Sequence, residues 1–386
     1  MTDKNTVAKA STAIIFGTAA VWFGAHAGGG FATGNQTMNF FVKFGWYALF
    51  IPLIAMGLLG LCFRNGMIFA RNNHTHDYKS FSKALFAPYD KIGSTLFEIC
   101  YIVQTMLATS ASIAGAAALL QQALGLPYGM GVLLMGITLL VLTIFGASLV
   151  RNASSILSIG IVVAVVLLVI LGLNAGWSNL THVVATKTTT AGLGAALWMG
   201  LLYAGFQSTL VAPVISVSEP IKLDSDVNKT AWIGIILNGV MLTITCIMLL
   251  GFFPASVNET LPTYYVCEQL GYSWLKILYS IVLLLALIST GVSMIFAIVN
   301  RFEIVWTSGS GIFENVVARR VVLCFGFMAV AMGISLFGLT AIVAKGYAYN
   351  GYLGILLIIL PLTIVAPIKN KKFAGGGRNA DDDVVA

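Results

Sequence analysis

The chain has 386 residues, of which 58% are hydrophobic and only 9% are charged. A soluble protein carries about 25% charged residues, and a soluble fold of this size could not bury so much apolar surface. The composition therefore excludes a soluble globular protein and predicts an integral membrane protein. The net charge of +7 follows from membrane topology and does not indicate a nucleic-acid partner.

Ten stretches of the chain are long and apolar enough to cross a membrane, which takes about 20 residues for a helix. They predict an all-α membrane protein with about ten transmembrane helices. The windows are 10–41, 44–63, 92–125, 127–150, 152–173, 191–218, 231–254, 277–300, 321–344 and 346–368.

The basic residues predict the orientation of these spans. With an even number of spans and a cytoplasmic N-terminus, 17 of the 21 Lys and Arg residues fall on the cytoplasmic side. Cytoplasmic segments of membrane proteins carry such an excess. We therefore expect a multi-pass protein of the cell membrane, surrounded by lipid, with both termini in the cytoplasm.

The connections between spans are short, with three exceptions. The basic cytoplasmic segment 71–91 is expected to contain a short interfacial helix. The external segment 255–275 is expected to be partly helical and is a candidate lid. The tail 369–386 is predicted to be disordered beyond its basic start, and residues 307–313 are interpreted as a turn.

Two of the spans contain sequences that disfavour a continuous helix. The first carries HAGGGFATG at 26–34, and each glycine there costs about 1 kcal/mol of helix propensity relative to alanine. The sixth carries AGFQST at 204–209. Dividing the chain into repeats at about 10–173 and 191–368 makes these two spans counterparts. Paired interruptions of this kind indicate a transporter site built from inverted repeats.

A broken helix in a membrane exposes main-chain groups that some other partner must satisfy. Free carbonyls at the end of the first half-helix are suitable ligands for a hard cation such as Na⁺. Free N–H groups at the start of the second half favour an anionic group such as a carboxylate. Glycine allows a ligand to approach the main chain closely.

Four polar residues within the spans have more than one interpretation. Ser289 and Thr290 could supply hydroxyl ligands to a cation, or bond to carbonyls of their own helix. Glu98 could be functional, or could meet water or Arg151 near the cytoplasmic end. His26 could titrate or bind substrate, or could be a hydrogen-bonded packing residue.

The whole chain resembles the amino acid–polyamine–organocation superfamily with the LeuT-type five-plus-five fold. Its GGGFATGNQ stretch is similar to the Gly-rich signature of YkvI-type membrane proteins. The resemblance implies a single membrane transporter domain over residues 1–386. It also implies a sodium site, whose ligands would be carbonyls of Gly24, Ala27 and Ala286 and the hydroxyls of Ser289 and Thr290. The first break contains no carboxylate, so a second sodium site is not expected.

The expected function is sodium-driven secondary transport of a small solute, an amino acid or related amine. A group of spans 1, 2, 6 and 7 would rock against a scaffold of spans 3, 4, 8 and 9. Proton coupling through Glu98 or His26 is an alternative, as is a membrane sensor that binds without transport. No HExxH or similar enzyme motif occurs, and no organic cofactor is expected. The predicted substrate-binding residues are His26, Gly28, Gly29, Gly30, Phe31, Glu98, Tyr101, Tyr203, Phe206, Gln207 and Ser208.

Overall fold

A computed structural model describes residues 9–145, 147–306 and 314–375, and every regular element in these ranges is helical. Within these ranges nine helices are long and apolar enough to cross a membrane, and the apolar helix Thr12–His26 is shorter. The uninterrupted long helices are α4 (Ile51–Asn73), α6 (Asp90–Leu124), α7 (Tyr128–Phe145), α8 (Ala147–Ala185), α11 (Asp224–Leu250), α13 (Ser273–Val305) and α14 (Val316–Ser335).

The remaining spans are composed of several segments. The first consists of α1 (Thr12–His26), α2 (Gly29–Ala32) and α3 (Asn35–Phe40), followed by the 3₁₀ segment η1 (Val42–Leu49). The sixth consists of α9 (Leu193–Gln207), η2 (Ser208–Leu210) and α10 (Val211–Val217). The last runs through α15 (Leu339–Ala341), η5 (Ile342–Tyr347), α16 (Ala348–Gly354), η6 (Ile355–Ile359), η7 (Pro361–Val365) and α17 (Ala366–Gly375).

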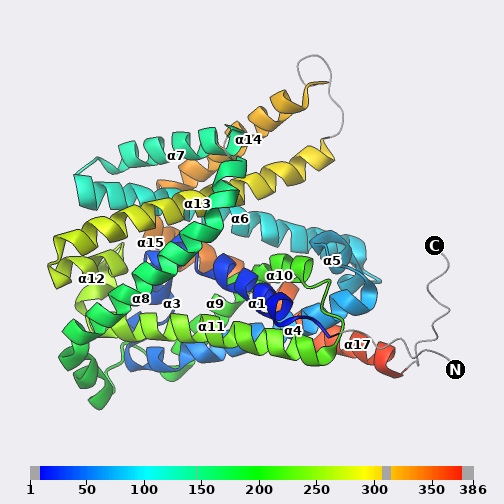
Figure 1. Cartoon of the computed structure of the whole chain (residues 1–386), viewed down its shortest axis with the longest axis horizontal. Helices are drawn as coiled ribbons and strands as arrows, with labels where there is room; N and C mark the ends of the chain where they lie inside the picture. Colours follow the sequence, from blue (N-terminus) through cyan, green and yellow to red (C-terminus); the bar gives the residue numbers. More distant parts are fainter. Residues whose placement is uncertain (1–8, 146, 307–313, 376–386) are drawn as a thin grey trace.

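The long helices form two groups that match the predicted division of the spans. A scaffold group, α6, α7, α13 and α14, packs together in one half of the molecule, and a bundle group, α1, α4, α9, α10 and α11, occupies the other (Figure 1). The helix α8 crosses between them and packs on both α13 and α11. The last span packs mainly on α9 and also reaches α6.

One side chain fastens α8 to the end of α11. The Asn179 side-chain amide donates hydrogen bonds to the carbonyls of Leu250, Gly251 and Phe253. The carbonyls in the last turn of a helix have no helical N–H groups ahead of them. Among the described residues, only the Leu250 carbonyl of these three also accepts a main-chain bond, from the Phe253 N–H.

The predicted count of ten spans is not confirmed, because nine helices among the described residues are long enough to cross a membrane. The predicted windows overlap the observed helices, but several boundaries differ. The window 321–344 is wrong at its end, because α14 stops at Ser335 and the chain turns at Gly338, whose φ is +86°. A left-handed turn of this kind is easiest for glycine. The window 152–173 is too short, because α8 continues to Ala185 through a more polar stretch.

The predicted break in the sixth span is not confirmed. Residues 204–209 remain helical, with only a short tightening to 3₁₀ geometry at Ser208–Leu210. The glycine at 205 serves close packing instead, since a Cβ on Gly205 would overlap the carbonyl oxygen of Gly351. A Cβ on Gly354 would likewise overlap the carbonyl oxygen of Gly205. Small residues bring helix backbones together in this way inside membranes.

The connections agree in part with their predictions. Segment 71–91 contains the helix α5 (Tyr78–Phe86), which Asp77 caps by accepting from the N–H groups of Lys79 and Ser80. Segment 255–275 contains the helix α12 (Pro262–Leu270). The first part of the predicted tail is helical, because α17 continues to Gly375. Residues 307–313 and 376–386, predicted as a turn and a disordered end, lie outside the described residues.

The glycine contact between α9 and α16 gives a testable prediction. Gly354→Ala should destabilise the protein by about 1–3 kcal/mol, because a new Cβ forces two backbones apart. Gly333→Ala on α14 is the matched control, since nothing lies within 4 Å of a Cβ there. Thermal unfolding in detergent measures both variants. Equal midpoints for the two would contradict the packing role.

Candidate functional site

The first span is interrupted at Ala27 and Gly28, between the end of α1 and the start of α2. The carbonyls of residues 24–27 have no hydrogen-bond partner among the described residues. The same holds for the N–H groups of Gly28, Gly30 and Phe31. Buried main-chain groups are nearly always paired in folded proteins, so this cluster of free donors and acceptors is an unusual feature.

The two halves of the first span pack on different groups of helices. The half before the break, α1, packs on α10 and α11 of the bundle group. The half after it, α2, packs on α6 and α13 of the scaffold group. The interruption therefore lies at the boundary between the two groups.

The three consecutive glycines in the break each make a close contact. A Cβ on Gly28 would lie 3.0 Å from Thr290 Oγ1, and one on Gly29 would lie 2.8 Å from Leu287 Cα. A Cβ on Gly30 would overlap the amide nitrogen of Gln36. Close approach, and not flexibility alone, therefore explains why glycine occupies all three positions.

The predicted hydroxyl pair on α13 lies beside the break. The Gly29 N–H donates to Thr290 Oγ1 over 2.9 Å. Ala286, one turn earlier on α13, is buried, and Ser289 is partly buried. The structure therefore brings Thr290 against Gly28 and Gly29 of the break. The predicted set of ion ligands stays a prediction.

His26, the last residue of α1, is held by two buried side chains. Its Nδ1 lies 2.7 Å from Asn238 Oδ1, and its Nε2 lies 2.6 Å from the Tyr203 hydroxyl. Asn238 Nδ2 donates to the Gly234 carbonyl, which turns its Oδ1 toward the histidine. Nδ1–H therefore donates to Asn238 and Nε2 accepts from Tyr203, so a neutral imidazole is fully satisfied.

Aromatic rings surround the region after the break. The Phe206 ring stacks on Tyr347, with centroids 4.7 Å apart and planes 23° apart. It also meets Tyr203 at 5.0 Å and Phe40 at 5.3 Å. Phe31 lies 5.4 Å from the His26 ring. The predicted residues His26, Phe31, Tyr203 and Phe206 thus form one connected cluster.

Two other predicted residues extend this cluster along α9 and its continuation. Gln207 Nε2 lies 3.5 Å from the Tyr203 hydroxyl. The Ser208 hydroxyl donates to the Gly205 carbonyl of its own helix over 2.6 Å. Gln207 therefore joins the His26–Tyr203 network, whereas the bond of Ser208 is local.

Glu98 and Tyr101 do not join this cluster. Glu98 Oε1 accepts from Arg301 Nε over 2.5 Å, an ion pair between α6 and α13. The Tyr101 ring stacks on Tyr78 of α5, with centroids 5.3 Å apart. Gly115 of α6 is the residue that faces Thr33 beyond the break. At 1.5 Å per residue, Glu98 lies about 25 Å of helix before it. Among the described side chains, the partner of Glu98 is Arg301.

The end of the molecule that we predict to be external is closed around the segment after the break. The Thr263 hydroxyl of α12 donates to the Ala32 carbonyl over 2.6 Å, and the Tyr279 hydroxyl donates to the same oxygen. The Thr263 N–H donates to the Thr33 carbonyl. The helix α12 is therefore fastened to α2.

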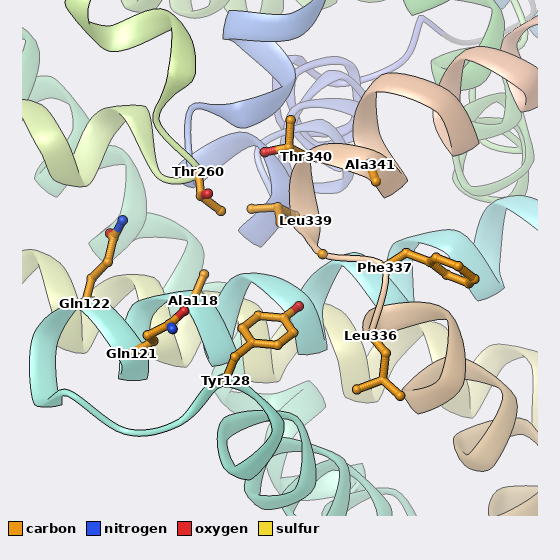
Figure 2. Close-up of a pocket in the computed structure, with 11 residues that line it drawn as sticks. Ala118, Gln121, Gln122, Tyr128, Thr260, Leu336, Phe337, Leu339, Thr340 and Ala341 are labelled. Atoms are coloured by element: carbon orange, nitrogen blue, oxygen red, sulfur yellow. The ribbon is translucent and has the colours of Figure 1, made fainter.

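A pocket of about 350 Å³ opens at the same end. Figure 2 shows its walls, with Gln121, Gln122 and Tyr128 on one side and Thr260 and Thr340 on the other. Asn35 of α3 ties two residues of this second side together, because its Nδ2 donates to the Thr260 carbonyl and to Thr340 Oγ1.

Sequence reasoning missed three residues of the central cluster, Gln36, Asn238 and Tyr347. Gln36 was seen only as a polar residue after the first break, and the other two lie more than 200 residues further along the chain. The sequence feature that could have identified these three residues is a polar amide or hydroxyl side chain within an otherwise apolar window.

Comparison with solved structures identifies the fold. Mhp1 in an inward-facing conformation superposes with a TM-score of 0.55, at 13% identity, over 93% of this chain and 91% of its own. A substrate-bound Na⁺-coupled sialic acid symporter gives 0.52, at 12% identity, over 92% and 97%. A manganese transporter of Eremococcus coleocola gives 0.51, at 15% identity, over 99% and 92%.

The chain has the LeuT-type fold. No family model matches the chain. The uncharacterized membrane protein YkvI of Bacillus subtilis is 30% identical over 124 residues, which are 32% of this chain and 35% of YkvI. The predicted resemblances to the LeuT-type fold and to YkvI are therefore confirmed, the second over about a third of each protein.

The contact between α2 and α13 can be tested at Gly29. In Gly29→Ala the new Cβ would meet the backbone of Leu287, so we expect a loss of about 1–3 kcal/mol in stability. Gly17→Ala on α1 is the control, because nothing lies within 4 Å of a Cβ there. Thermal unfolding of the purified proteins measures the difference. An unchanged midpoint for Gly29→Ala would show that α2 and α13 are not packed this closely.

The Glu98–Arg301 ion pair gives a second prediction for this region. A double-mutant cycle with Glu98→Gln and Arg301→Gln should give a coupling of about 1 kcal/mol in stability, as for a partly exposed pair. Neither variant should change solute affinity by more than about twofold, because the pair lies far from the break. A large loss of affinity in Glu98→Gln alone would restore this residue to the binding site.

Proposed function

We propose that this protein is a secondary active transporter of a small solute, an amino acid or related amine, driven by a sodium gradient. The observation that carries the proposal is the break itself, where the carbonyls of residues 24–27 have no partner among the described residues and the next residues, Gly28 and Gly29, contact Thr290 of the scaffold group. Free carbonyl and hydroxyl oxygens, without a carboxylate, form a neutral oxygen cage of the kind a monovalent hard cation can occupy.

The proposed ion site joins the two groups of helices. Gly24 and Ala27 would supply carbonyls from the bundle group, while Ala286, Ser289 and Thr290 would supply oxygens from the scaffold group. An ion bound there would favour the arrangement in which both sets lie together. Differential binding of this kind is what allows a ligand to shift a conformational equilibrium.

The proposed solute site lies next to the ion. The free N–H groups of Gly28, Gly30 and Phe31 can donate to carboxylate oxygens, and the glycines leave the main chain accessible. The rings of Phe31, Tyr203 and Phe206 would cover the apolar part of the solute. A sodium ion at the adjacent carbonyls would add electrostatic attraction for the carboxylate.

The transport cycle would use the break as its hinge. Since α1 packs with the bundle group and α2 with the scaffold group, a relative movement of the groups bends the chain at Ala27 and Gly28. The bonds of Thr263 and Tyr279 to Ala32 hold the predicted external end closed. Entry from outside would require these bonds and those of Asn35 to open.

The solved relatives support transport, since they include a manganese transporter and a Na⁺-coupled sialic acid symporter. Proton coupling receives less support from the geometry. Both ring nitrogens of His26 are already bonded, and Glu98 is paired with Arg301. Sodium therefore remains the proposed driving ion.

Uptake by proteoliposomes tests the ion assignment. A sodium gradient should drive accumulation of a radiolabelled amino acid, and Ser289→Ala or Thr290→Val should weaken sodium activation by about 5- to 100-fold. This range corresponds to the loss of a contact worth about 1–3 kcal/mol. Thr290→Ser, which keeps the hydroxyl, should retain activation.

Ser293→Ala is the matched control for this series, because Ser293 lies one turn further along α13 and is exposed. Sodium coupling would be refuted if uptake did not depend on the sodium gradient and was unchanged in both Ser289→Ala and Thr290→Val. Saturable solute binding without flux above that of empty liposomes would instead favour a sensor.

A further inference from the structure

Gln36 lies just after the break, and its buried side-chain oxygen has no partner among the described residues. It lies on α3 and is 6% exposed. Its Oε1 accepts no hydrogen bond. We propose that Gln36 recognises a hydrogen-bond donor on a flat, uncharged part of the solute, an inference that rests on the proposed transport function.

The position of the Gln36 amide is fixed by its neighbours. Its side chain folds back over Gly30, where any Cβ would overlap the amide nitrogen. The Tyr347 hydroxyl lies on the same side, 3.9 Å from the position that a Cβ on Gly30 would take. The amide nitrogen therefore lies beside Gly30, while the amide oxygen lacks a donor. A buried carbonyl without a donor costs free energy, and a ligand N–H or O–H would remove that cost.

The rings beside Gln36 suit a planar group. Tyr347 stacks on Phe206, and Phe206 in turn meets Tyr203 and Phe40. Aromatic faces and edges pack favourably on other flat groups at offset or tilted angles. A planar group of the solute that entered beside Tyr347 would meet ring surfaces and the free oxygen of Gln36 together.

The surroundings of Gln36 also exclude a charged partner. His26, on the far side of Phe31, is neutral in its hydrogen-bonding pattern. Glu98 is bound to Arg301, and Lys345 of η5 is exposed. No carboxylate or ammonium among the described residues contacts the amide. A charged solute group here would lack a counter-ion, and burial of an unpaired charge is costly.

These observations indicate the class of solute. Its main polar group would lie at the break, and its second polar group would be a neutral N–H or O–H on a flat side chain. Phenol, indole and carboxamide side chains meet this description. Aliphatic side chains and acidic side chains do not.

Binding of matched amino acids by the full-length protein in sodium buffer tests the proposal. L-tyrosine is compared with L-phenylalanine, and L-glutamine with L-methionine, by isothermal titration calorimetry. Each pair differs in the donor and little in size. In the wild-type protein we expect the donor-bearing member to bind at least about tenfold more tightly, because a site built to bond a donor rejects analogues that lack it.

Gln36→Met removes the amide at nearly constant length and should bring both ratios to about one. Gln122→Met, at an exposed glutamine of the external pocket, should keep the wild-type ratios. Equal affinities within both pairs in the wild-type protein would overturn the role of Gln36 and leave the transport proposal standing. Preserved ratios in Gln36→Met would also overturn it. Failure of all four amino acids to bind would overturn this inference together with the amino-acid transport proposal.

Discussion

Main-chain hydrogen bonding at the end of α1 is the constraint on which the rest of this molecule depends. In a membrane, water is not available to satisfy free carbonyls and N–H groups, so a helix can stop only where other partners exist. The partners found here are few. Thr290 accepts from the Gly29 N–H, whereas the carbonyls of residues 24–27 are left free. The close approach of α13, which brings Thr290 to this point, is possible because Gly28 and Gly29 have no side chains at the contact.

The same interruption allows the two halves of the first span to pack on different groups of helices. A continuous helix would tie the bundle group rigidly to the scaffold group. Because the chain is not helical at Ala27 and Gly28, α1 can remain packed on α11 while α2 remains packed on α13. His26 strengthens the first of these attachments through Asn238, and Thr263 strengthens the second through Ala32. Each half of the span is thus fixed to its own group, and the flexible backbone lies between them.

The sequence was sufficient to predict the all-helical membrane fold. It was not sufficient for the exact number of spans or for the pair of broken helices, and the reasons are physical. Apolar length identifies a spanning helix, but it does not distinguish the left-handed turn at Gly338 from a continuing span. Glycine content does not distinguish a break from close packing, which is why Gly205 was misread while Gly28–Gly30 were read correctly as an interruption. Glu98 was judged as a lone acid, because its partner Arg301 lies 203 positions away. Contacts between distant segments, including Gln36 with Tyr347, have no local signal.

The described ion pairs lie away from the break in the first span. The four ion pairs among the described residues, formed by Arg71, Lys229, Arg301 and Arg320 with acidic partners, all lie toward the predicted cytoplasmic end. The region around the break holds only dipoles, hydroxyls, amides and rings. No fixed carboxylate would neutralise the charge of a cation in this low-dielectric region. The cation would therefore interact strongly with a solute bound beside it. A solute with a negative group would then bind more tightly when the ion is present, and the ion would bind more tightly when the solute is present. The absence of fixed charge from the described residues at the break thus offers a direct physical route to coupling between ion and solute.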